Sequence, residues 1–156
     1  MELSEQLKFV PLLVMPDINA GSDMDSINMK NYHSATLVIT FDNALAGDPI
    51  LTLNSGASDG TKTTAETFSY RYGSAATASA TSDTLTTRAT SAGLEITGAT
   101  LVSRMLICEI DASAMTVGQE FLTPSLSAAG SAGGCHCVAI LTPRYQGNVI
   151  PSAIPA

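Results

Sequence analysis

The chain has 156 residues, of which 45% are hydrophobic and 13% are charged, and its formal net charge is −7. This length fits one domain with a core of its own, and so few charges exclude a disordered, highly charged chain. Because an acidic surface neutralises phosphate groups poorly, we expect neither nucleic acid nor an anionic membrane surface as a partner. Trp is absent and Ser, Thr and Gly are frequent, which is typical of an all-β domain with many turns.

Residues 8–17, KFVPLLVMPD, combine apolar side chains with two prolines. Pro11 and Pro16 donate no backbone hydrogen bond, which disfavours a central strand. The segment lacks the basic region and the uninterrupted apolar run of a signal peptide, and it is too short to span a bilayer, so we expect a soluble protein made in the cytoplasm. We predict an extended N-terminal arm, residues 1–25, that lies against its own domain or against a neighbour. Its candidate contact residues are Phe9, Val10, Leu12, Leu13 and Val14.

Short strands separated by turn residues are predicted along the middle of the chain. HSATLVITF (33–41) and ETFSYRY (66–72) alternate with a period of two, as expected of strands with one buried face. The Ser-, Thr- and Ala-rich stretch 74–93 is predicted to form a surface loop or a weak edge hairpin, and the stretch 112–134 is predicted to be rich in loops. Further strands are expected at 26–29, 50–56, 94–97, 103–111 and 135–145.

Taken together, the predicted elements are about seven to nine short strands without a helical repeat. The pattern predicts one all-β domain of residues 26–147, with the architecture of a β-sandwich or a jelly roll. Residues 148–156, which contain two prolines, are expected to form a C-terminal tail.

The motif Cys135-His136-Cys137 is similar to the beginning of a metal site. In a strand, however, successive side chains point to opposite faces, so the two thiols are expected to share a face while His136 points away. A structural zinc needs four ligands, usually from two separated pairs. The chain has only one other cysteine, Cys108, and one other histidine, His33. We therefore predict no metal and no cofactor, and we interpret the thiols as small apolar core residues.

Two further candidates for chemistry have a simpler interpretation. Asp17, Asp23 and Asp25 lie in an oxygen-rich stretch of the kind that binds calcium, but the further ligands and the terminal Glu of an EF-hand loop are missing. Asp and Ser also favour turns through local hydrogen bonds. His33 is expected in an exposed turn. Since no phosphate-binding loop, zinc-protease motif or nucleophile elbow occurs, we predict that the chain is not an enzyme.

Glu66, Phe68, Tyr70 and Tyr72 are predicted to share one face of a strand. Such an aromatic stripe is a stacking platform for sugars or bases where it is exposed. More often it is the buried face of the strand. We expect Glu66 to mark the point at which this strand leaves the core.

Several segments in the first half of the chain follow one another in a characteristic order. They are KFVPLLVMPDI (8–18), an acidic Ser-containing spacer, INMKNYHSATLVITF (27–41), ETFSYRYG (66–73) and a Ser-, Thr- and Ala-rich stretch with SDT at 82–84. This order resembles small virion proteins of tailed bacteriophages that are encoded near the major capsid protein, in particular head decoration (cement) proteins.

The resemblance implies a non-enzymatic structural protein that binds the outside of an icosahedral head and bridges capsid subunits. It implies the major capsid protein as a partner and a homo-oligomer, with a trimer favoured, on the capsid surface of a virion made in the host cytoplasm. Two alternatives stay open: a carbohydrate- or receptor-binding β-sandwich module of a fibre or surface domain, and another virion part such as a head–tail connector or minor tail protein. The first predicts an exposed aromatic cluster, whereas decoration predicts an apolar surface that contacts a protein shell.

Overall fold

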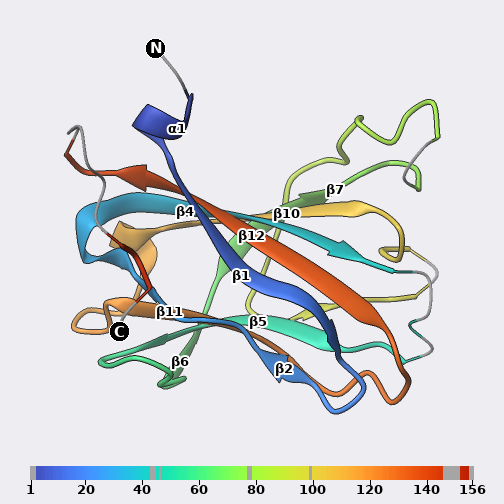
Figure 1. Cartoon of the computed structure of the whole chain (residues 1–156), viewed down its shortest axis with the longest axis horizontal. Helices are drawn as coiled ribbons and strands as arrows, with labels where there is room; N and C mark the ends of the chain where they lie inside the picture. Colours follow the sequence, from blue (N-terminus) through green and yellow to red (C-terminus); the bar gives the residue numbers. More distant parts are fainter. Residues whose placement is uncertain are drawn as a thin grey trace.

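The computed structural model describes residues 3–42, 45, 47–76, 79–98, 100–145 and 152–154. These residues form two antiparallel sheets that lie face to face as the two layers of a sandwich (Figure 1). The predicted all-β sandwich is confirmed, with twelve strands. Twelve strands are more than the seven to nine that the sequence predicts. The additional strands have two or three residues, which is too short for an alternation of side chains to be recognised in the sequence. Within the described residues the α-helix α1 (Leu3–Gln6) is a single turn, and no helix there is long and apolar enough to cross a membrane.

Sheet A contains six strands in the order β1-β12-β4-β10-β7-β8. Their bounds are β1 (Lys8–Asp17), β12 (Gly134–Pro143), β4 (Tyr32–Phe41), β10 (Met105–Asp111), β7 (Phe68–Tyr72) and β8 (Ala89–Ser91). β12 and β4 pair over nearly their whole length, from Cys135 opposite Phe41 to Thr142 opposite Ser34. The last long strand of the chain therefore lies inside the sheet, between β1 and β4.

Sheet B has the order β2-β11-β5-β6, and β3 also pairs with β11 and β9 with β5. The bounds are β2 (Ser22–Asp23), β11 (Phe121–Leu126), β5 (Ile50–Gly56), β6 (Thr64–Glu66), β3 (Ile27–Asn28) and β9 (Leu94–Glu95). Two 3-10 turns, η1 (Met29–Asn31) and η2 (Ala112–Ala114), follow β3 and β10.

β11 lies in the stretch 112–134, where the composition predicts loops, and that prediction is wrong for this strand. Pro124 stands in its middle, although proline interrupts most interior strands. The Pro124 carbonyl accepts the Met24 N–H at 2.9 Å, on the side where β2 and β3 leave a gap between them. Since the N–H and C=O of one residue point to the same side of an antiparallel strand, the missing N–H faces this gap and not β5.

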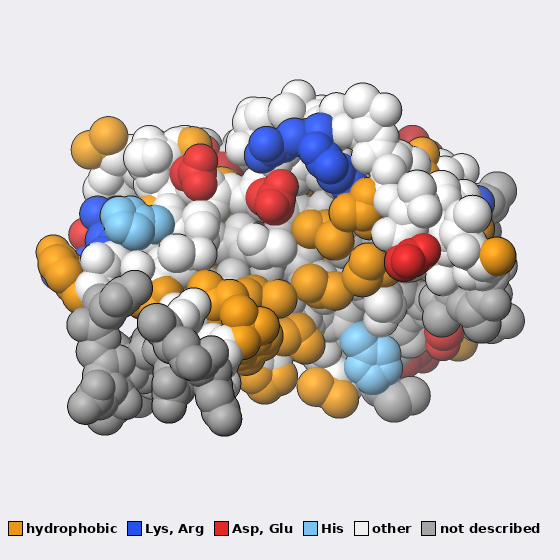
Figure 2. All heavy atoms as spheres, turned by 90° about the horizontal axis from the view of Figure 1, so that it is seen from above, with side chains coloured by type: hydrophobic (Ala, Val, Ile, Leu, Met, Phe, Trp, Pro, Cys, Tyr) orange, Lys and Arg blue, Asp and Glu red, His pale blue; other side chains and the backbone are white. Residues whose placement is uncertain are grey.

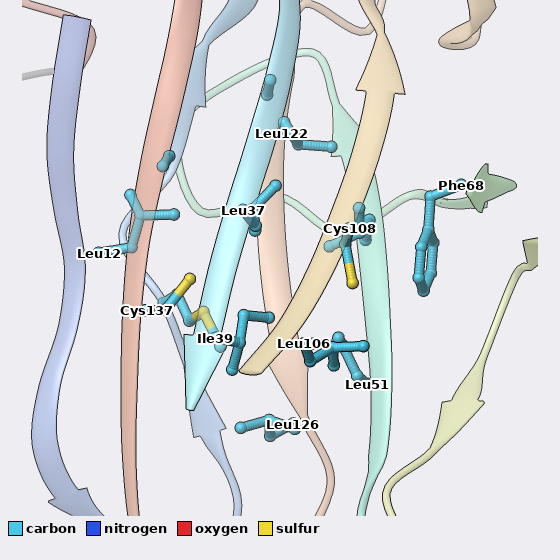
Figure 3. Packing of buried hydrophobic residues seen from close by; sticks show 14 of the residues in the cluster. Leu12, Leu37, Ile39, Leu51, Phe68, Leu106, Cys108, Leu122, Leu126 and Cys137 are labelled. Atoms are coloured by element: carbon cyan, nitrogen blue, oxygen red, sulfur yellow. The ribbon is translucent and has the colours of Figure 1, made fainter. Parts of the chain in front are cut away.

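The core lies between the two sheets and is built from alternate residues of each strand. On β4, Leu37 and Ile39 are fully buried, whereas Thr36 and Val38 point to the opposite face. Burying one such aliphatic side chain contributes roughly 1.5–3 kcal/mol. Figure 3 shows core side chains from both sheets, among them Leu37, Ile39, Leu106 and Cys108 of sheet A and Leu51, Leu122 and Leu126 of sheet B.

The segment predicted as an arm contributes an edge strand to the sandwich. β1 pairs with β12 from Lys8 opposite Leu141 to Asp17 opposite Gly134, with irregularities after Pro11 and after Val14. One side of an edge strand has no ladder to complete, which is why proline is tolerated there. The segment is extended, as predicted, and it packs on its own domain.

Two weakly patterned stretches also lie along the sandwich. In the stretch 74–93, β8 pairs with the edge of β7 and Leu85 bridges to Gly73, an arrangement close to the predicted weak edge hairpin. Of the tail predicted at 148–156, residues 152–154 are described. Ala153 is buried, and its carbonyl accepts the Asn28 N–H at 2.8 Å.

Candidate interaction surface

The Cys-His-Cys motif is divided between the two faces of β12. Cys135, Cys137 and Cys108 are fully buried, whereas His136 is exposed on the other face, so the predicted alternation is confirmed. Burial raises the pKa of Cys135 to about 12 and raises that of Cys137 well above its ordinary value. Both groups are therefore protonated thiols, which are poor nucleophiles and poor metal ligands. Within the described residues, no three His, Cys, Asp or Glu side chains are placed to hold a metal ion.

Two of the three carboxylates of the acidic stretch, those of Asp17 and Asp23, accept hydrogen bonds within the chain, and Asp25 is exposed. Asp23 is exposed and accepts hydrogen bonds from Lys62 Nζ at 2.7 Å and from Ser125 Oγ at 2.6 Å, which lower its pKa. Asp17 accepts a backbone N–H two residues further on at 3.0 Å, as expected of a turn aspartate. His33 is exposed at the beginning of β4.

The aromatic stripe of β7 faces the core. Phe68 is 1% exposed, and Tyr70 and Tyr72 are half-buried against the core cluster. The rings of Phe68 and Tyr70 pack with their centroids 6.4 Å apart and their planes tilted by 59°. The interpretation of this stripe as a buried strand face is thus confirmed for Phe68 and in part for the two tyrosines.

Glu66 contradicts one expectation. It ends β6 in sheet B, just before the chain crosses to β7 in sheet A, yet it is only 7% exposed. The prediction that the strand leaves the core here is wrong, because the buried carboxylate has donors of its own: Ser55 Oγ at 2.5 Å and the Thr116 N–H at 2.7 Å. Burial opposes ionisation, but these hydrogen bonds outweigh it and lower the pKa of Glu66. Glu66 therefore ties the loop after η2 to sheet B.

The five candidate contact residues divide between the two faces of β1. Val10 and Leu12 are 3% and 4% exposed in the core of the chain's own sandwich, so neither is available to a partner in this fold. Leu13 is half-buried and packs against the same core. Phe9 and Val14 are 41% and 71% exposed. The division follows from the alternation of side chains along the strand.

Phe9 and Val14, the two exposed residues among the five candidates, belong to a larger apolar surface on the outside of sheet A. In its central row, Pro11 of β1 lies opposite Val138 of β12. Val38 of β4 pairs with Val138, and Ile107 of β10 pairs with Val38, so the row crosses four strands. With the rows on either side it forms an apolar patch of eight residues: Phe9, Pro11, Val14, Val38, Met105, Ile107, Val138 and Ile140.

The rows that contain the apolar patch are comparable in area to the largest apolar patches of monomeric proteins. Four strands about 4.8 Å apart and three rows about 6.7 Å apart span about 400 Å². Eight of the twelve positions in this area are apolar, and the other four are Thr36, Thr40, Glu109 and His136. The largest apolar patches of monomeric proteins reach about 300–600 Å², and such patches are often functional. Figure 2 shows hydrophobic side chains in a band across this face, with a group of basic side chains beside it. The patch is the strongest candidate for a protein-contact surface in the described part of the chain.

The sequence indicates only one edge of this surface. Phe9 and Val14 can be recognised as candidates because residues 8–17 combine apolar side chains with two prolines. Val38 lies between Thr36 and Thr40, so its outward orientation follows from the alternation, but nothing in the sequence places it beside Val138. The patch arises from the register of four strands, which brings together positions up to 131 residues apart in the chain, such as Phe9 and Ile140.

Comparison with known proteins gives a likeness of fold. No protein-family model matches the chain, and no curated protein matches its sequence. Among solved structures, the chain is similar to the crystal structure of SPBc2 prophage-derived protein YomS. The TM-score is 0.52 at 9% sequence identity, and the match covers 86% of this chain and 93% of that chain. At this identity the likeness shows a shared fold, because one fold supports many unrelated functions.

Proposed function

We propose that this chain is a non-enzymatic structural protein of a bacteriophage virion, which decorates the exterior of the head and bridges subunits of the major capsid protein. The observation that supports the proposal is the apolar patch on sheet A, a candidate surface for the contacts of an assembled head, with capsid subunits or with a neighbouring copy of this chain. The order of segments in the first half of the chain supports a phage role. The fold shared with a prophage-derived protein supports it as well.

The state of the reactive side chains supports a structural role. The buried thiols Cys135 and Cys137 are held in their protonated form, and His136 lies on the opposite face of their strand. A Cys–His nucleophilic pair requires the imidazole within hydrogen-bonding reach of the sulfur. The geometry of β12 separates these groups.

The carbohydrate-binding alternative loses its main sequence signal. It requires aromatic rings that are exposed for stacking. In β7 the Phe68 ring is buried, and Tyr70 and Tyr72 pack against the core. The central row of sheet A is aliphatic instead, with Pro11, Val138, Val38 and Ile107, which favours a protein partner.

Purified particles provide the test of the virion role. We expect the chain in particles purified by density gradient, in many copies per head, and we expect antibodies against it to label the heads of intact particles in electron microscopy. Antibody label at the tail or neck would favour another virion part. Absence of the chain from purified particles whose lysate contains it would contradict the proposal.

A further inference from the structure

We propose that the outer face of sheet A pairs with the same face of a second copy of this chain, so that the protein is a face-to-face dimer. This inference does not depend on the virion role. It starts from the apolar patch, whose centre is the row Pro11, Val138, Val38 and Ile107. In an antiparallel sheet with one solvated face, these outward positions are normally polar.

The area of the face matches what a stable pair requires. The three rows that contain the apolar patch cover about 400 Å², with polar residues at four of their twelve positions. The whole outer face, from the strand lengths and a spacing of about 4.8 Å, covers about 700 Å². A standard protein interface buries about 800 Å² on each partner, with an apolar centre and a polar rim. The roughness of the side chains adds to the flat area, so one face of sheet A supplies one half of such an interface.

The rim of the patch is polar and hydrogen-bonded, as in the interfaces of stable pairs. On the β7 side, Arg88 donates to Ser69 Oγ at 2.6 Å and lies 3.6 Å from the carboxylate of Glu109. Arg71 ends the central row beside Ile107. These side chains frame the apolar centre and remain in contact with water when it is covered.

Charge also favours a second copy on this face. The chain has 14 acidic residues and a net charge of −7, so two copies repel one another over most of their surface. The three rows of the patch contain one of these acidic residues, Glu109, and its charge is offset by Arg88. With Arg71 at the end of the central row, these three rows carry no net negative charge. Two copies that meet through this face therefore avoid the electrostatic repulsion that acts between their other surfaces.

The geometry of the face suits sheet-on-sheet packing. Two twisted sheets pack with their strands about 30° from parallel and about 10 Å apart, and their facing side chains interdigitate. In a two-fold pair the same patch supplies both halves, so shape and chemistry match by symmetry. β-branched Val38 and Val138 at the centre are stiff side chains that lose little rotamer freedom on packing. The opposite outer face, on sheet B, stays free for other contacts.

The test compares one substitution at two exposed valines. Val138→Glu places a carboxylate at the centre of the proposed interface, and Val117→Glu places it at a position that is 98% exposed, outside sheet A. We expect sedimentation equilibrium of the full chain to give twice the chain mass of 16.1 kDa. In Val138→Glu the Kd should rise by about a hundredfold or more, since pairing would take two unpaired carboxylates out of water. Val117→Glu should leave the Kd unchanged.

A second variant and a folding control keep the result interpretable. Val14→Glu lies at the rim of the patch, on a residue that is 71% exposed, and should weaken pairing without disturbing the core. Circular dichroism and the Tm of each variant establish that the sandwich is intact. A wild-type chain that stays monomeric at millimolar concentration would overturn the proposal. So would a dimer or trimer whose Kd is the same in Val14→Glu and Val117→Glu.

Discussion

The two outer faces of the sandwich are built from the same kind of strand and differ in chemistry. On sheet A, the central row that crosses β12, β4 and β10 presents Val138, Val38 and Ile107 to the outside, between rows that mix apolar and polar residues. On sheet B, the corresponding rows cross β11 and β5 and place Ser125 opposite Thr52 and Thr123 opposite Asn54. Both sheets bury leucines on their inner faces. The contrast therefore lies outside the core, where folding alone does not require apolar residues.

The polar face of sheet B satisfies its own groups. Asn54 Nδ2 donates to Thr52 Oγ1 at 2.9 Å, and Ser125 Oγ donates to Asp23 Oδ1 at 2.6 Å. A face of this kind is stable in water and needs no partner. The aliphatic side chains on the apolar face of sheet A cannot form such hydrogen bonds. They are stabilised only when another surface covers them and removes them from water. The difference makes the outer face of sheet A the candidate for contact with another protein.

The largest expected effect is a difference in the rate at which thiols on the inner and on the outer face of β12 react. The native thiols are buried and their pKa values are raised, that of Cys135 to about 12, so they should react with a disulfide reagent only when the sandwich opens. In Val138→Cys the new thiol is on the outer face and should react about a thousandfold faster or more, measured in dilute protein by absorbance. Equal rates for the new and the native thiols would show that the inner face is open.

The next effect compares neighbouring residues of β4. Leu37→Ala leaves a cavity in the core and should lower the free energy of unfolding by about 2–5 kcal/mol. Val38→Ala, one residue further on the outer face, should cost less than about 1 kcal/mol in the monomer. Urea unfolding of both variants at the same dilute concentration gives the two values. Comparable losses would mean that Val38 is part of the folding core and would weaken its role as a contact residue.

Period-two alternation explains why the fold could be predicted and the interaction surface could not. Leu37 and Ile39, with threonines beside them, indicate a half-buried strand directly, and the same reasoning places Cys135 and Cys137 inward. The number of sheets and the partners of each strand depend on pairings such as Lys8 with Leu141, which no local pattern records.

Proline and buried charge account for the particular errors. Pro124 disfavours a strand when the sequence is considered alone. A strand is possible here because the missing N–H of Pro124 faces the gap between β2 and β3. Glu66 has the composition of a surface residue, and only the donors Ser55 and Thr116, from distant parts of the chain, allow its burial. In both cases the decisive partner is a backbone or hydroxyl group whose position follows from the completed fold.

A smaller effect tests Glu66 through pH. Its pKa is lowered in the fold, so the native state binds fewer protons than the unfolded chain. The stabilisation is complete above the ordinary value of 4.5 and is lost as the pH falls through the lower native value. Glu66→Gln should cost about 1–3 kcal/mol near neutral pH, because it weakens the hydrogen bonds from Ser55 and Thr116. Urea titrations across this pH range should show the difference between wild type and variant shrinking toward acid.

A control with an exposed carboxylate separates this effect from the general acid response of the protein. Glu95 is exposed at the end of β9, and Glu95→Gln should follow the wild-type profile. A constant difference between wild type and Glu66→Gln at every pH would show that the cost comes from packing and not from the ionised hydrogen bonds.

The smallest effect is expected on the polar face of sheet B. Asp23 pairs with Lys62 at 2.7 Å, but the two side chains are 55% and 37% exposed, so water and salt screen the pair. Asp23→Asn keeps an acceptor for Ser125 and should change the free energy of unfolding by less than about 1 kcal/mol, with the difference vanishing at high salt. It should also leave the oligomeric mass unchanged, in contrast to Val138→Glu on the opposite face. A loss of self-association in Asp23→Asn would move the interface to sheet B and reverse the comparison between the two faces.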